Sequence, residues 1–179
     1  MTKIAVIVGS LRQESFNKQL AHVIEKLLPE DVEFVYADIS DFPLFNQDNE
    51  ADYPAAAQAA KDQIAEADGV LIVTPEYNRS VPVVLKNAID WLSRPYEQNP
   101  FDNKPVAVAG TGGVWGTTFA QTHLKATLLY LDAKVLGQPE VYVARASSMF
   151  EAKDTITDER TIEFLQKFVD RFLQHITSN

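Results

Sequence analysis

Three short segments of the sequence carry residue types that could hold an anionic, planar ligand, and the first covers residues 9–17. Ser10, Ser15 and Asn17 offer neutral hydrogen-bonding groups there. Arg12 adds a guanidinium fork that suits phosphate. The segment lies between an apolar run and a helical pattern, so its backbone N–H groups should face an anion at a helix N-terminus. A simple helix cap at Ser15 or Asn17, with Arg12 in solvent, explains the same residues about equally well.

The glycine content of this first segment limits the kind of ligand. Gly9 is its only glycine, which excludes the G-x-G-x-x-G fingerprint of dinucleotide-binding loops. The chain also lacks the G-x-x-x-x-G-K-[ST] pattern that cradles nucleoside triphosphates. A monophosphate held mainly by side-chain hydroxyls is therefore the better fit.

The second segment is a turn bracketed by Pro75 and Pro82. Two prolines stiffen the turn, so its backbone N–H and C=O groups can be held at fixed positions. A flavin ring needs backbone donors of this kind and a flat aromatic neighbour. Tyr77 could supply the aromatic contact and Asn78 an amide donor. The alternative is that Tyr77 is a half-buried packing residue and that Glu76 is a solvated loop carboxylate.

The third segment, residues 110–117, is rich in glycine. Glycines allow the backbone to approach a planar ligand closely, although a flexible turn has the same composition. Trp115 could wall a pocket or lie in a subunit contact. The three histidines of the chain show no metal-ligand spacing, and no catalytic-triad motif is present.

Apolar runs alternate with segments of helical period along the chain. Strands are expected at residues 4–8, 32–39, 70–74 and 105–109, with a broken fifth strand at 135–143. Helices are expected at residues 17–28, 54–67, 82–95, 118–131 and 158–176, and a long loop at 40–53. The alternation predicts an α/β fold, a flavodoxin-like three-layer sandwich with a five-stranded parallel sheet of order 2-1-3-4-5. Ligands of such folds lie outside the carboxyl ends of the strands, where all three segments fall.

Composition narrows the function further. The length of 179 residues indicates one domain covering 1–179. A net charge of −9 disfavours nucleic acid as a partner, because such a surface repels phosphate backbones. The cysteine count is 0, so any redox function must use a cofactor. The first apolar run is too short for a membrane span or a signal peptide, so we expect a cytoplasmic protein with no membrane partner.

Two motifs resemble those of a known enzyme family. The first reads Ser10-Leu11-Arg12-x-x-Ser15-x-Asn17. The second reads Pro75-Glu76-Tyr77-Asn78-x-Ser80-x-Pro82-x-x-Leu85-Lys86-Asn87-Ala88-Ile89-Asp90-Trp91. Together with Pro43-Leu44-Phe45-Asn46, they are similar to the NADPH-dependent FMN reductases, particularly the chromate and quinone reductase branch.

The resemblance implies an FMN-dependent oxidoreductase with NADPH or NADH as co-substrate. Such an enzyme transfers hydride through flavin N5 to quinones or other small acceptors, such as azo compounds, chromate or flavin. It also implies a homodimer or homotetramer. The expected cofactor-binding residues are Ser10, Arg12, Ser15, Phe16, Asn17, Pro75, Glu76, Tyr77, Asn78, Ser80, Thr111 and Gly112. No catalytic side chain and no metal are expected, because the flavin carries the chemistry.

Two features bear on alternatives to this interpretation. Many family members have arginine where this chain has Phe119, which leaves the choice between NADPH and NADH open. A flavodoxin-type single-electron carrier is the main alternative function, and a non-catalytic nucleotide sensor is another. The turn between Pro75 and Pro82 has no glycine, so its backbone should not rearrange easily, and this favours two-electron transfer.

Overall fold

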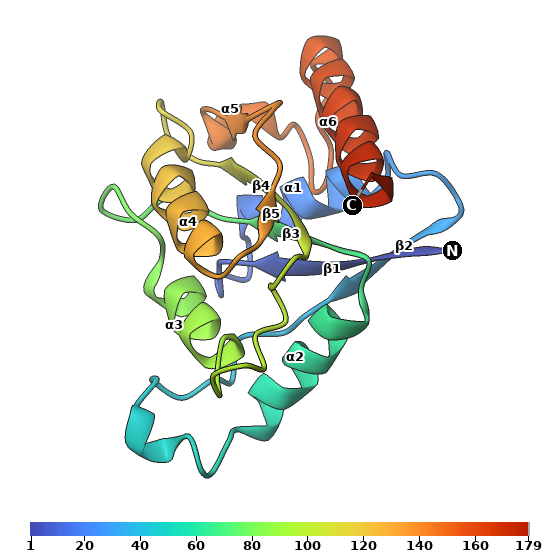
Figure 1. Cartoon of the computed structure of the whole chain (residues 1–179). Coiled ribbons are helices and arrows are strands. Elements are labelled where there is room, and N and C mark those ends of the chain that lie inside the picture. The colour runs from blue at the N-terminus through green and yellow to red at the C-terminus, as the bar shows by residue number, and fades with distance from the viewer. Residues whose placement is uncertain (179) are drawn as a thin grey trace.

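A parallel β-sheet forms the middle layer of the computed structural model, which describes residues 1–178 (Figure 1). Its strands are β1 (Thr2–Val8), β2 (Val32–Tyr36), β3 (Gly69–Val73), β4 (Pro105–Thr111), β5 (Lys134–Val135) and β6 (Val141–Val143). The strand order is β2-β1-β3-β4-β5, with β6 also paired to β4, and every pairing is parallel. The predicted flavodoxin-like order is therefore confirmed.

The fifth position of the sheet is shared by two short strands. β5 pairs with the start of β4 at Pro105 and Val106, whereas β6 pairs with its end, from Ala109 to Thr111. Pro139 lies between the two strands and has no N–H with which to continue a ladder. The predicted broken strand is thus two strands, and β6 reaches the carboxyl end of the sheet.

The central strands are apolar along their length because helices cover both of their faces. Every residue of β3 and of β4 is buried. The register pairs Val8 with Val73, and Val73 with Ala109. The segments that follow β1, β3 and β4 therefore leave the sheet at the same edge, as the sequence predicted.

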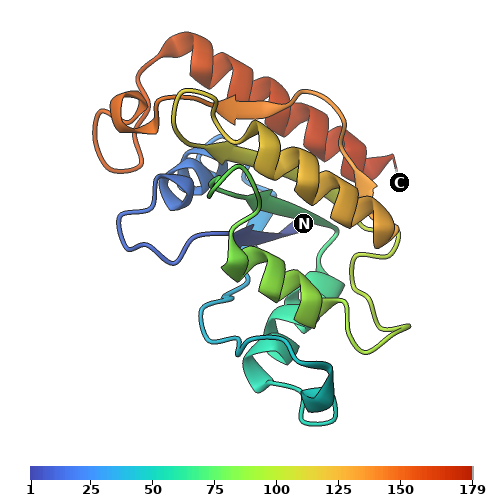
Figure 2. The ribbon, with the colours of Figure 1, turned by 90° about the vertical axis from the view of Figure 1, so that its left-hand side faces the viewer.

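Helices form the two outer layers (Figures 1 and 2). They are α1 (Phe16–Glu25), α2 (Ala55–Glu66), α3 (Val83–Leu92), α4 (Thr118–Tyr130), α5 (Ala146–Met149) and α6 (Glu159–Thr177). α1 and α6 pack on one face of the sheet, and α2, α3 and α4 pack on the other. Within residues 1–178, no helix is both long and apolar enough to cross a membrane.

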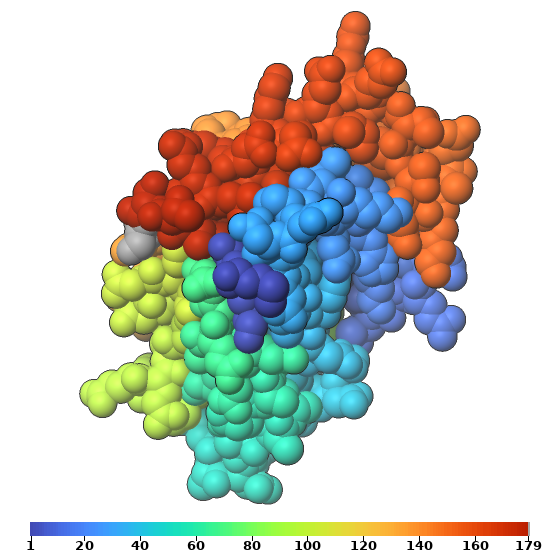
Figure 3. All heavy atoms as spheres, turned by 90° about the vertical axis from the view of Figure 1, so that its right-hand side faces the viewer, coloured from blue at the N-terminus to red at the C-terminus, as the bar shows by residue number. Residues whose placement is uncertain are grey.

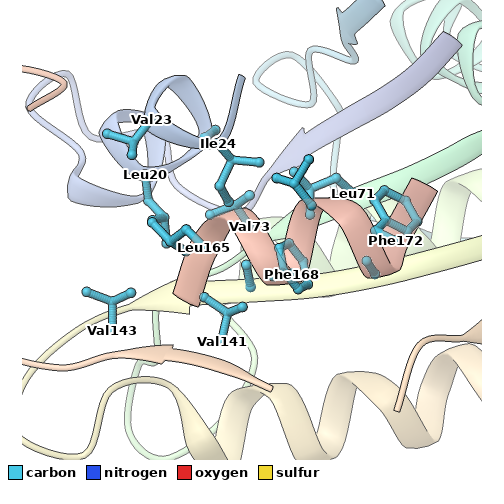
Figure 4. Close-up of a cluster of buried hydrophobic side chains, with 14 of the residues drawn as sticks. Leu20, Val23, Ile24, Leu71, Val73, Val141, Val143, Leu165, Phe168 and Phe172 are labelled. Atoms are coloured by element: carbon cyan, nitrogen blue, oxygen red, sulfur yellow. The ribbon is translucent and has the colours of Figure 1, made fainter. Parts of the chain in front are cut away.

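The core beneath α1 and α6 shows why α6 docks where it does (Figure 4). In α6 the buried residues are Leu165, Phe168, Val169 and Phe172, a spacing that places them on one helix face. These side chains meet apolar side chains of α1, β3 and β6. Figure 3 views the β2 edge of the sheet, where α6 (red) lies along one side and α2 (green) along the other.

Two segments differ from the sequence expectation. The expected loop at residues 40–53 contains a short 3-10 helix, η1 (Gln47–Asn49), and is fixed to α3. Asn87 accepts from the Phe45 N–H at 2.8 Å, and the indole of Trp91 donates to the Pro43 carbonyl at 2.8 Å. The four-residue helix α5 was not expected, because a single turn leaves no periodic signal in the sequence.

Candidate active site

The segments after β1, β3, β4 and β6 gather at one end of the sheet (Figure 2). They enclose a cavity of about 630 Å³. It is lined by Ser10, Arg12, Ser15, Phe16, Asn17, Pro75, Glu76, Tyr77, Thr111, Gly112, Gly113, Val114, Arg145, Ala146, Ser147 and Ser148. The lining includes every predicted cofactor-binding residue except Asn78 and Ser80.

One end of the cavity lies at the N-terminus of α1. Ser15 is the N-cap residue of that helix, and its hydroxyl accepts from the Lys18 N–H at 3.4 Å. Ser10 and Ser15 are only 4% and 3% exposed, and the first turn of α1 has no acidic residue. The Arg12 guanidinium lies 5.5 Å from the centre of the Phe16 ring, which supports it. Buried hydroxyls, an arginine and a positive helix end together suit a phosphate group.

Asn17 joins this end of the cavity to the end of β4. Its amide donates to the Thr111 carbonyl at 3.0 Å, and its side-chain oxygen accepts from the Thr111 N–H at 2.9 Å. The side chain is therefore engaged with backbone, and one amide N–H remains for a ligand. Asn17 positions the segment after β1 relative to β4 in addition to lining the cavity.

Thr111 lines the cavity and has a buried hydroxyl without a partner in the described part of the chain. The residue is 1% exposed, and its Oγ1 has no hydrogen-bond partner among the described residues. A buried hydroxyl without a partner destabilises a fold by about 1–3 kcal/mol, so a ligand with a polar edge would relieve that cost. Next to it, a Cβ added to Gly112 would lie 2.6 Å from the Gly116 carbonyl oxygen, so only glycine fits there.

The segment after β3 forms a tight turn from Tyr77 to Ser80. The two residues exchange backbone hydrogen bonds of 3.2 and 3.0 Å, and the residues between them, Asn78 and Arg79, have φ values of 50° and 62°. Two positive φ values are typical of a type I′ turn. The turn carries Asn78 away from the cavity, and the Ser80 hydroxyl lies 3.0 Å from Nδ1 of His123. Tyr77 remains at the rim, 52% exposed.

Glu76 lines the cavity and also caps a helix, so the alternative of a solvated loop carboxylate does not hold. Its side chain is 7% exposed, and one oxygen accepts from the N–H groups of Phe119 at 2.8 Å and Ala120 at 3.1 Å. Thr117, the N-cap residue of α4, makes no side-chain cap. Glu76 therefore satisfies two N–H groups in the first turn of α4 and ties the turn after β3 to that helix.

The comparisons with known proteins decide the family. The model for the NADPH-dependent FMN reductases matches residues 2–148. This chain belongs to that family. It is 52% identical over 171 residues to a 2-hydroxy-1,4-benzoquinone reductase of Burkholderia sp, covering 95% of this chain and 93% of the relative. It is 43% identical over 178 residues to a quinone reductase of Pseudomonas putida, covering 98% and 95%.

A solved structure gives the same result. FerB, a flavoenzyme NAD(P)H:(acceptor) oxidoreductase from Paracoccus denitrificans, superposes with a TM-score of 0.93 at 44% identity. The alignment covers 99% of this chain and 98% of FerB. The chain is thus an oxidoreductase that uses FMN as cofactor and NAD(P)H as co-substrate, which confirms the predicted enzyme class and cofactors.

In this reductase, residues 145–148 are part of the cavity wall that sequence reasoning missed. The Arg145 N–H donates to the Gly113 carbonyl at 2.9 Å, and the Ala146 N–H donates to the Gly112 carbonyl at 2.9 Å. These bonds hold α5 against the glycine-rich turn. The signal was available, because residues 144–148 follow β6 and so lie at the carboxyl end of the fifth strand position.

The cavity is locally cationic although the reductase carries a net charge of −9. Its lining holds two arginines, Arg12 and Arg145, and one carboxylate, Glu76, whose charge is engaged in capping α4. Such a pocket accepts an anion on an otherwise acidic surface.

Proposed function

We propose that this chain is a quinone reductase that holds FMN in the cavity at the carboxyl edge of the sheet and passes hydride from NAD(P)H to quinones or similar small acceptors. The observation that carries the proposal is the division of the cavity into two ends. The end at α1 offers buried serines and Arg12, and the end at β4 offers glycines and the unpaired Thr111 hydroxyl. The relatives named as quinone reductases support quinones as the acceptors.

The residues present fit FMN, and each end of the cavity has a distinct task. Bound FMN supplies hydride chemistry at its N5 atom. Ser10, Arg12 and Ser15 hold the phosphate, while Asn17 keeps their segment in register with β4. Thr111 hydrogen-bonds to a polar atom of the ligand, and Tyr77 covers one side of the cavity. The lining has no histidine, which suits a reaction in which side chains orient the reactants and do not transfer protons.

The turn beside the cavity favours an enzyme over a single-electron carrier. It is closed by the backbone pair of Tyr77 and Ser80, and Glu76 fixes it to α4. The Ser80–His123 contact adds a third attachment. A turn held at three points resists backbone rearrangement, so we assign two-electron transfer to this chain and keep the flavodoxin-type carrier as the alternative.

The proposal extends to the setting of the enzyme. We infer a single FMN-binding domain spanning 1–179, of which residue 179 lies outside the described residues, acting in the cytoplasm on small molecules. Neither nucleic acid nor a membrane is a partner. We also infer a homodimer or homotetramer, supported by an apolar surface at α4 where Leu129 and Tyr130 are 62% and 81% exposed. Light scattering of the purified protein measures the oligomeric state.

An absorbance experiment tests the function. The purified protein should show the flavin spectrum and release FMN on denaturation. Under anaerobic conditions, NADH or NADPH should bleach the flavin, and a quinone should restore the oxidised spectrum. A colourless protein that takes up no added FMN would overturn the cofactor site, and a flavoprotein reduced by neither nicotinamide would be a carrier.

A further inference from the structure

A second cavity of about 600 Å³ adjoins the proposed flavin site. It lies between the turn after β3 and the glycine-rich turn after β4, and its wall is formed by Glu76, Asn78, Arg79 and residues 113–116. Glu76, Gly113 and Val114 line both cavities, so the two cavities are neighbours. The lining of the second cavity includes none of the residues at the α1 end of the first.

Arg79 is the cation of this second cavity, and its position is fixed from two sides. Its Nη1 lies 3.2 Å from Oε1 of Glu76, and its guanidinium carbon lies 5.4 Å from the centre of the Phe119 ring. The side chain is nevertheless 58% exposed. The guanidinium carries several N–H donors and uses one of them on Glu76, so most of them are available to a ligand.

The backbone at Arg79 is strained. Its φ of 62° lies in the left-handed region, which glycine and asparagine tolerate and arginine does not favour. Strain of this kind clusters at ligand-binding sites. An arginine held in an unfavourable conformation, at the wall of a cavity and beside a reaction site, points to a ligand for its guanidinium.

The walls beside Arg79 suit a nucleotide. Val114 and Trp115 are both 66% exposed in the same turn and offer an apolar surface for a sugar or a base. A nicotinamide dinucleotide that reaches a flavin in the first cavity must extend its phosphates beyond that cavity. The neighbouring second cavity offers room for them and a positioned cation.

We propose that Arg79 binds a phosphate group of NAD(P)H in this second cavity and so determines the affinity for the co-substrate. The proposal rests on the proposed function and adds a residue and a site to it. Phe119 itself offers no charge to a phosphate, and the guanidinium stacked over its ring supplies that charge from the neighbouring turn.

Calorimetric titration of the FMN-loaded enzyme with NADP⁺ and with NAD⁺ tests the proposal, because neither dinucleotide can reduce the flavin. Arg79→Gln should weaken binding about tenfold, as expected for loss of one charge-assisted contact, and Arg79→Lys should retain part of the affinity. Arg160→Gln removes the same charge from α6 and should leave both affinities unchanged. A larger loss for NADP⁺ assigns the 2′-phosphate as the bound group, and equal losses assign the pyrophosphate.

Arg79→Gly separates binding from structure, because glycine adopts the left-handed conformation without strain. This variant should keep its FMN content and melting temperature and still bind both dinucleotides about tenfold more weakly. Unchanged affinities in Arg79→Gln and Arg79→Gly would overturn the proposal. A loss of FMN that parallels the loss of dinucleotide affinity would also overturn it, since Arg79 would then only support the turn. With either of these outcomes the proposed function still stands, provided that the wild-type enzyme is yellow and is reduced by NAD(P)H.

Discussion

The unpaired hydroxyl of Thr111 gives a prediction in which stability and ligand affinity change in opposite directions. Replacing Thr111 with valine keeps the shape of the side chain and removes a buried hydroxyl that has no partner among the described residues. An unsatisfied buried polar group costs about 1–3 kcal/mol, and we take the lower limit here. The apoprotein of Thr111→Val should therefore be more stable by about 1 kcal/mol, which raises the melting temperature by about 2–4 °C.

The same substitution should weaken FMN binding. If the hydroxyl bonds to the ligand, its loss removes one neutral hydrogen bond, worth about 1 kcal/mol, so the dissociation constant should rise about fivefold. Thermal unfolding of the apoprotein by circular dichroism measures the first effect. Titration of the apoprotein with FMN, followed by flavin fluorescence, measures the second.

Thr117→Val is the matched control for Thr111→Val. Thr117 is also fully buried, but its hydroxyl accepts from the Gln121 side chain at 2.8 Å and does not line the cavity. The control should lower the melting temperature by a few degrees and leave FMN affinity unchanged, since it breaks a satisfied bond of about 1 kcal/mol. If Thr111→Val destabilises the apoprotein as the control does, or leaves FMN affinity unchanged, the hydroxyl is not a vacant ligand contact.

Two further predictions concern charge. Arg12→Ala should lower the affinity for FMN by about one to two decades and the affinity for riboflavin much less, because only FMN has a phosphate. Equal losses of affinity for the two ligands in parallel titrations would show that Arg12 does not bind the phosphate. A hydrogen bond from Lys125, and to a smaller extent one from Tyr142, lowers the pKa of Glu140. The ionised Glu140 therefore stabilises the fold fully above the ordinary pKa of 4.5, and this contribution is lost as pH falls through the lowered pKa. Because the Glu140 side chain is 36% exposed, Glu140→Gln should lower the free energy of unfolding by only about 0.5 kcal/mol at neutral pH. The melting temperature of the variant should also fall less steeply at acidic pH than that of the wild type. An unchanged dependence of melting temperature on acidic pH would contradict this.

The sequence predicted the fold well because its signals there are local and repeated. Continuous apolar runs mark strands covered on both faces, and the helical period marks the segments between them. The helix expected at residues 118–131 is observed at Thr118–Tyr130. The short helix α5 was missed because its four residues are stabilised by backbone bonds to the glycine-rich turn, far away in the sequence.

The site was predicted less completely because the direction of a side chain depends on backbone angles. Asn78 and Ser80 belong to the expected motif, but the left-handed turn removes both from the cavity wall. Arg79 is the second of the two central residues of this turn, a position where glycine is preferred, so little in the sequence indicated the turn. The role of Glu76 could not be predicted either, since the N–H groups that it caps lie 43 and 44 residues further along the chain.

The pairing of Asn17 with Thr111 explains how such distant segments form one site. The two residues are 94 positions apart, and they exchange two buried hydrogen bonds between the segment after β1 and the last residue of β4. Asn17 satisfies both the N–H and the carbonyl of Thr111, so the backbone of Thr111 is fixed beside the cavity. The α1 end and the glycine-rich end of the cavity are therefore positioned by one contact that forms only when β1, β3 and β4 are in register. Because assembly of the sheet sets this contact, both ends of the cavity should be in place before the cofactor binds.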